Sequence, residues 1–156
     1  MKTFNHVGSE LQDLKTENID GRRFYKTPNG NYQSITTLLS NLSKVGIQAW
    51  RKRVGEEEAN RISRQASGRG TRVHNIAESY IKNQEDHLEG VLPDAAEMFQ
   101  SITPLIDRID NVHCVEGALY SDELKLAGRT DLIAEFDGEL SAIDYKTSKR
   151  IKIWDH

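Results

Sequence analysis

The spacing of apolar residues changes along the chain and divides it into three parts. Residues 1–33 are mostly polar, but Pro28–Gly30 separates two runs that contain aromatic residues, which predicts a loose arm followed by a small hairpin. Between residues 34 and 110 apolar residues recur every three or four positions, as they do in helices that bury one face. From residue 112 to 148 the period is two, which predicts strands of a sheet.

The helical part is expected to be interrupted more than once. A helix capped by Ser34 or Thr36 should end near Val45–Gly46, and a second helical segment should follow it. Gly68 and Gly70 should then break the next segment, because glycine is a poor helix former.

Two apolar stripes in this part are predicted to face the core. The first follows the two glycines and consists of Val73, Ile76, Ala77, Tyr80 and Ile81. A helix that begins at Pro93, and that Pro104 should kink or end, carries the second: Ala96, Phe99, Ile102, Leu105, Ile106 and Ile109.

The strand pattern contains a hairpin between Leu126 and Ser148, read as two strands joined at Asp137–Gly138. An Asp-Gly pair between apolar runs is a strong signal for a two-residue turn. The register that this turn sets places Asp131 directly opposite Asp144, and strand periodicity places Lys146 on the same face as Asp144. Two carboxylates and an ammonium group should therefore converge.

Carboxylates held this close repel each other, so a cation between them is expected. Hard divalent cations prefer carboxylate oxygens, and a site that also has one imidazole suits Mg²⁺ or Mn²⁺ better than Zn²⁺. His74, four residues before Glu78 on the flank of the first stripe, could supply the imidazole, and Glu116 in the preceding strand could add a carboxylate. Such a cation would activate water for attack on a phosphate, with Lys146 beside it.

Plainer interpretations of these residues stay open. Asp131 could pair with Arg129, and Lys146 with Asp144, as exposed ion pairs, while His74 could sit at the core margin. The predicted register also places Arg129 opposite Lys146, and strand twist or a bound phosphate would have to separate these two cations.

Composition favours one domain that functions in a reducing compartment. The 156 residues carry a net charge of −3, which argues against broad nucleic-acid affinity but allows a local basic groove. Cys114 is the only cysteine, and the sequence shows no signal peptide and no membrane-spanning run, so an intracellular, cytoplasmic protein is expected. Candidate phosphate contacts are Arg69 and Arg72 at a predicted helix start, and the hydroxyls of Thr147 and Ser148.

Three motifs together resemble the PD-(D/E)XK nuclease superfamily, and its RecB-type exonuclease branch in particular, which includes phage and mitochondrial exonucleases. These are R-G-T-x-x-H ending at His74, G-R-T-D ending at Asp131, and D-Y-K-T-S beginning at Asp144. The resemblance implies an α/β fold of the α+β-like kind, with a restriction-endonuclease-like core. In that core, N-terminal helices pack on a mixed sheet whose first three strands form an antiparallel meander.

The same resemblance implies roles for single residues. Asp131 and Asp144 would bind Mg²⁺ or Mn²⁺ together with His74 and the backbone carbonyl of Tyr145, and Lys146 would be catalytic. The expected activity is that of a metal-dependent DNA nuclease, an exonuclease acting on single-stranded DNA or DNA ends in DNA processing, recombination or repair.

The family pattern continues beyond the lysine strand with a helix, commonly carrying Gln and Tyr that hold DNA, and with a further strand. Only KRIKIWDH follows Ser148. We therefore expect one domain over residues 1–156 that lacks the C-terminal part of the fold. Two other functions remain open, a catalytically silent module that binds nucleic acid or a partner, and a phosphoesterase for small phosphorylated substrates.

Overall fold

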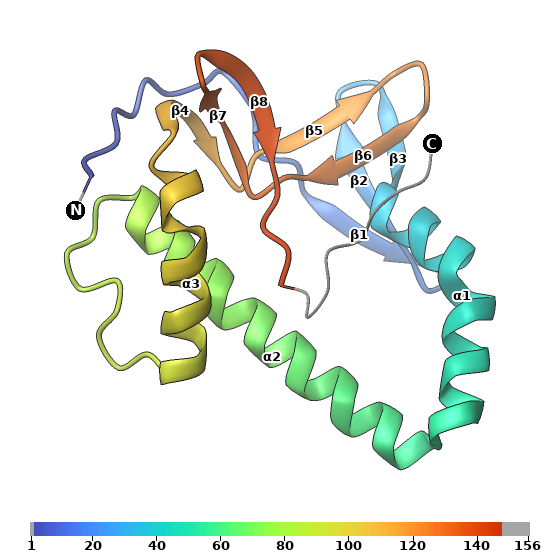
Figure 1. Ribbon diagram of the computed structural model, residues 1–156. Helices are drawn as coiled ribbons and strands as arrows, with labels where there is room; N and C mark the ends of the chain where they lie inside the picture. The colour runs from blue at the N-terminus through green and yellow to red at the C-terminus, as the bar shows by residue number, and fades with distance from the viewer. Residues whose placement is uncertain (1, 148–156) are drawn as a thin grey trace.

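The computed structural model describes residues 2–147, which form helices and strands in an α/β arrangement (Figure 1). None of the helices within these residues is long and apolar enough to cross a membrane. In chain order the elements are β1 (Thr16–Ile19), β2 (Arg22–Thr27), β3 (Gly30–Ser34), α1 (Ile35–Val54), α2 (Glu56–Ile81), α3 (Pro93–Ile106), β4 (Ile109–Val115), β5 (Ala118–Ser121), β6 (Leu126–Arg129), β7 (Leu132–Phe136) and β8 (Glu139–Ile143).

The strands belong to two sheets. One has the order β1-β2-β3-β6-β5, in which β3 and β6 run parallel and the other neighbours antiparallel. The other has the order β4-β7-β8 and is antiparallel throughout. The predicted hairpin around Pro28–Gly30 is confirmed as β2–β3. The mixed α/β class predicted from the sequence is confirmed as well.

The helices are longer and fewer than the sequence predicts. The expected end near Val45–Gly46 is wrong, because α1 continues to Val54, where Gly55 with φ 88° separates it from α2. The expected interruption at Gly68 and Gly70 is also wrong, since α2 runs through both. A glycine costs a helix only about 1 kcal/mol relative to alanine, which packing elsewhere along a long helix can offset.

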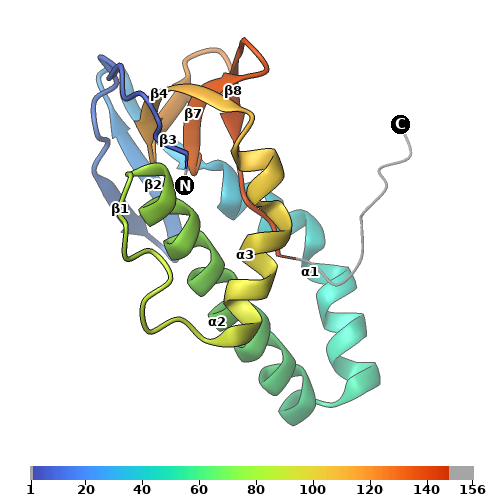
Figure 2. The ribbon, with the colours of Figure 1, turned by 60° about the vertical axis from the view of Figure 1, so that its left-hand side comes forward.

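The main core lies between one face of the β4-β7-β8 sheet, α3 and the C-terminal half of α2 (Figure 2). The predicted stripe of α2 is confirmed in full, since all five of its residues are buried. The second predicted stripe is confirmed as buried at Phe99, Ile106 and Ile109, although Ile109 belongs to β4 and not to the helix, whereas Leu105 is 53% exposed. Pro104 lies inside the last turn and does not end the helix before Ile106. A smaller core in the other sheet contains Leu14, Tyr25, Tyr32, Ala118 and Ala127.

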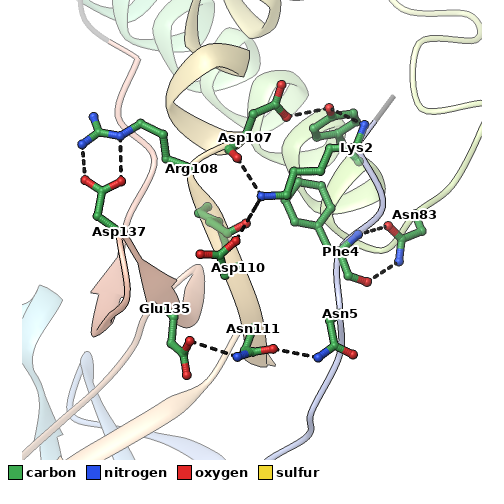
Figure 3. A network of polar contacts seen from close by, with 12 residues as sticks. Lys2, Phe4, Asn5, Asn83, Asp107, Arg108, Asp110, Asn111, Glu135 and Asp137 are labelled. Carbon is green, nitrogen blue, oxygen red and sulfur yellow. Dashed lines mark hydrogen bonds and ion pairs between the residues drawn. The ribbon is translucent and has the colours of Figure 1, made fainter.

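The N-terminal arm is tied to the main core instead of being loose (Figure 3). The backbone N–H of Phe4 donates to the Asn83 side-chain oxygen over 2.7 Å, and the Asn83 amide donates back to the Phe4 carbonyl over 3.0 Å. Lys2 Nζ donates to the carbonyls of Asp107 and Ile109. These bonds give hydrogen-bond partners to backbone groups of the arm and of the chain around the start of β4.

The position of the core predicts a large difference between two identical substitutions. Ile109→Ala should lower the free energy of unfolding by about 2–5 kcal/mol, because Ile109 is 1% exposed and its loss leaves a cavity. Ile47→Ala on α1, where the side chain is 47% exposed, should change it by roughly 0.5 kcal/mol or less. Urea denaturation followed by circular dichroism measures both, and equal losses would contradict the core described above.

Candidate active site

The β7–β8 hairpin forms in the predicted register. Phe136 pairs with Glu139, and the pairing continues outward to Leu132 and Ile143. Asp137 and Gly138 both have positive φ, 52° and 84°, as a turn of this kind requires. The chain positions of Asp131 and Asp144 therefore lie one step beyond the last strand pair, at the same end of the hairpin.

The strand that was predicted to run from Leu126 to the turn is divided in two. It ends as β6 at Arg129 in one sheet and begins again as β7 at Leu132 in the other. Arg129 pairs with Ala118 and forms an ion pair with Asp13, so the expected juxtaposition of Arg129 with Lys146 is wrong. The predicted clash of two cations does not arise.

Three of the predicted site residues come together where the chain crosses between the sheets. His74 extends from α2, with Nδ1 3.4 Å from Oδ1 of Asp131 and Nε2 2.5 Å from the backbone carbonyl oxygen of Tyr145. The backbone N–H of Tyr145 donates to Oδ2 of Asp131 over 2.6 Å. The His74 imidazole, the Asp131 carboxylate and the Tyr145 carbonyl thus come from three separate segments of the chain and contact one another directly.

These groups line a pocket of about 20 Å³, which is room for one water-sized group. Glu116 and Glu78 also line it. The backbone of Glu116 has φ 54°, a left-handed conformation that costs a non-glycine residue on the order of 1–2 kcal/mol. Such strain is concentrated at functional sites, where surrounding contacts maintain it.

Glu78 lines the pocket but is not among the functional residues that the sequence predicts. It lies four residues after His74 in α2, so a helix places both on one side. Its carboxylate also binds Lys82 one turn further along. The spacing was visible in the sequence, but nothing there distinguished a pocket-lining acid from a solvent-exposed one.

Asp144 and Lys146 lie outside this pocket and pair with each other. Their side chains are 45% and 77% exposed, at the edge of a neighbouring apolar pocket of about 240 Å³ between α3 and the hairpin. Of the two ion pairs considered from the sequence, the structure contains this one, while Arg129 binds Asp13 instead of Asp131. The assignment of Asp144 and Lys146 to the site stays a prediction.

The tyrosine ring of Tyr145 has a structural place beside the pocket. It packs edge-on against the His74 ring, with centroids 5.8 Å apart. Burial raises the pKa of the Tyr145 phenol, and the nearby Asp131 carboxylate raises it further, so the phenol stays protonated at neutral pH. The contacts of Tyr145 with His74 Nε2 and with the Asp131 carboxylate are made by its backbone.

The residues predicted to contact phosphate do not all lie where the sequence places them. Because α2 is continuous, Arg69 and Arg72 lie inside a helix and not at a start with free N–H groups. Arg72 lies 3.5 Å from Asp94 at the first turn of α3. Thr147 lies beside α2, with Oγ1 3.4 Å from the place a Cβ on Gly70 would occupy, and Ser148 lies outside the described residues.

The donor atoms of the pocket are of the type that a hard divalent cation accepts. His74, Asp131 and the Tyr145 carbonyl supply one nitrogen and two kinds of oxygen. Within residues 2–147, however, no three His, Cys, Asp or Glu side chains are grouped closely enough to hold a metal ion. The chemistry thus fits Mg²⁺ or Mn²⁺ with two side chains and one carbonyl in place, and Glu116 and Glu78 at the pocket wall.

Comparison with known proteins matches the chain to one family. The model of the PD-(D/E)XK nuclease superfamily matches residues 22–153. Mitochondrial genome maintenance exonuclease 1 of Mus musculus is 28% identical over 110 residues, and that of Homo sapiens is 26% identical over 113 residues. Each match covers 68% of this chain but only 32% of the relative, so the chain spans about a third of the length of these relatives.

The arrangement predicts that Asp131 dominates cation binding. Asp131→Asn keeps the shape and an acceptor for the Tyr145 N–H but removes the charge, so Mn²⁺ should bind at least roughly 10-fold more weakly. Isothermal titration calorimetry measures the affinity. Asp20→Asn, in the exposed β1–β2 turn, is the matched control and should leave it unchanged. Equal affinities for the two variants would exclude this pocket as the cation site.

Proposed function

This chain belongs to the PD-(D/E)XK nuclease superfamily, and from that premise we propose that it is a metal-dependent deoxyribonuclease that hydrolyses phosphodiester bonds in DNA. The observation that carries the proposal is the convergence of His74, Asp131 and the Tyr145 carbonyl on one small pocket. Nucleases of this superfamily generally use divalent metals, and these are donors that such a metal accepts.

His74, Asp131 and the Tyr145 carbonyl would hold the cation, with Asp144 joining them as the family motif implies. When bound, the cation would make a water molecule more acidic and stabilise negative charge on a phosphate oxygen. Asp131 is fixed in advance by the backbone N–H of Tyr145, and His74 is fixed by α2. The His74 Nε2–H donates to the Tyr145 carbonyl oxygen over 2.5 Å, and it would have to release that oxygen before both atoms could bind a cation.

Lys146 would place its ammonium group beside the phosphate under attack. Its present partner is Asp144, and the side chains are 77% and 45% exposed, respectively. An exposed ion pair has little net strength, so a phosphate and a cation could readily draw the two side chains apart. Asp144 would then turn toward Asp131, and Lys146 would stabilise charge on the phosphate or orient the attacking water.

The relatives suggest the mode of cleavage. Both are named as exonucleases, and this chain resembles them over 68% of its length. We extend that mode to this chain as part of the proposal, with DNA ends as the expected point of attack. An enzyme for small phosphorylated substrates, or a module that only binds, would behave differently in the assays that follow.

The proposal predicts that Lys146 is needed for cleavage but not for folding. End-labelled DNA should be degraded in Mg²⁺ or Mn²⁺ and stay intact with EDTA, and Lys146→Ala should lower the rate on the order of 10²-fold or more. The melting temperature should not change, since Lys146 is 77% exposed. Lys44→Ala, an exposed lysine on α1, is the matched control.

Each negative result has its own meaning. A wild-type chain that binds Mn²⁺ but leaves DNA intact would be a silent binding module. Turnover of a small phosphodiester without DNA cleavage would indicate a different phosphoesterase. Full activity in Lys146→Ala would remove the lysine from the mechanism.

The exonuclease mode predicts a dependence on free ends. Linear single-stranded DNA should be shortened progressively, and a covalently closed circle of the same sequence should survive under identical conditions. Gel analysis of 5′- and 3′-labelled strands measures this difference and shows which end is attacked. Linearisation of the circle by the same preparation would show internal cutting and contradict the proposed mode.

A further inference from the structure

Two crossings of the chain between the sheets lie side by side next to the pocket. Glu116 and Gly117 connect β4 to β5, and Thr130 and Asp131 connect β6 to β7. The backbone N–H of Glu116 donates to the Asp131 carbonyl over 2.8 Å, and that of Thr130 donates to the Gly117 carbonyl over 3.0 Å. The position of Asp131 is therefore coupled to the bend at Glu116.

Arg129 uses both terminal nitrogens of its guanidinium group next to these crossings. Nη1 donates to the Glu116 carbonyl oxygen over 2.7 Å, and Nη2 binds the Asp13 carboxylate over 2.5 Å. The hydrogen bond to Asp13 raises the pKa of Arg129, and the Glu116 carboxylate adds a smaller electrostatic contribution of the same sign. The guanidinium group thus joins the segment before β1 to the bend beside the pocket.

The bend itself has little freedom. Glu116 has φ 54°, and a Cβ on Gly117 would come within 2.8 Å of Cδ1 of Ile133. Glu116 is an exposed residue that lines the pocket containing His74 and Asp131. A left-handed residue keeps its conformation only where its surroundings maintain it, and the Arg129 contact to its carbonyl is one of those constraints.

We propose that Arg129 is a positioning residue that, fixed by Asp13, holds the Glu116 bend and through it the position of Asp131 at the pocket. The proposal rests on the proposed function in one respect, because it takes that pocket as the cation site. Arg129 contacts no group that would bind the cation itself. Its effect is transmitted through the backbone of Glu116 and Asp131.

Removal of the guanidinium should weaken cation binding without abolishing the fold. Arg129→Ala is expected to raise the dissociation constant for Mn²⁺ roughly 10- to 100-fold, as changes to groups that orient metal ligands do. Arg108→Ala is the control, because Arg108 also uses two guanidinium nitrogens, but binds the single carboxylate of Asp137 at the far end of the hairpin. The dissociation constant of the Arg108→Ala variant for Mn²⁺ should equal that of the wild type.

Further variants test the route of the effect. Arg129→Lys keeps the positive charge but lacks the planar group that contacts Glu116 and Asp13 at the same time. It should therefore bind Mn²⁺ as weakly as Arg129→Ala does. In a Glu116→Gln background, Arg129→Ala should weaken binding clearly less than it does in the wild type, since coupled residues are not additive. Amide hydrogen exchange of the metal-free chain should be faster at Glu116 and Thr130 in Arg129→Ala but not in Arg108→Ala.

The outcomes separate this inference from the proposed function. If the wild type binds Mn²⁺ and Arg129→Ala binds it equally well, the positioning role is wrong and the cation site stands. If Arg129→Ala only lowers the melting temperature, with Mn²⁺ affinity and local exchange unchanged, Arg129 is structural. If the wild type itself neither binds Mn²⁺ nor cleaves DNA, the proposed function fails, and the inference fails with it.

Discussion

The crossing of the chain at Thr130–Asp131 is the constraint on which the rest of the site depends. Here the polypeptide leaves one sheet and enters the other, and its backbone is bonded to the second crossing at Glu116–Gly117. A carboxylate placed on a continuous strand would share its face with every second residue, whereas a carboxylate at a crossing is separated from both strands. Asp131 can therefore meet His74 of α2 and the backbone of Tyr145 at once.

The sequence predicts those parts of the fold that depend on neighbours in the chain. The β7–β8 register follows from the Asp137–Gly138 turn, and the buried stripe of α2 follows from its helical spacing. The break between β6 and β7 could not be predicted, because apolar residues alternate on both sides of it. The break accompanies the parallel pairing of β6 with β3, which lies about ninety positions earlier in the chain. The spacing of neighbouring residues contains no information on such a distant pairing.

The candidate site is predictable to a similar extent. His74 and Asp131 were proposed from residue type and spacing, and they do meet. Glu78 was not proposed as functional, since an acid one turn after a histidine resembles any solvated helix residue. The role of Arg129 was hidden too, because it depends on Asp13, a residue of the polar N-terminal segment that carries no pattern of its own.

If Asp144 and Lys146 belong to the site as proposed, it would consist of a fixed part and an exchangeable part. His74, Asp131 and the Tyr145 backbone are held by α2, by the sheet crossing and by one another, whereas Asp144 and Lys146 neutralise each other at the surface. A ligand shifts such an equilibrium only by its difference in affinity for the two arrangements. A bound cation would gain the Asp144 carboxylate as a ligand, and a phosphate would gain the Lys146 ammonium as a partner, only when this surface pair separates. The two ligands would therefore favour the same rearrangement, and each would strengthen binding of the other at this site.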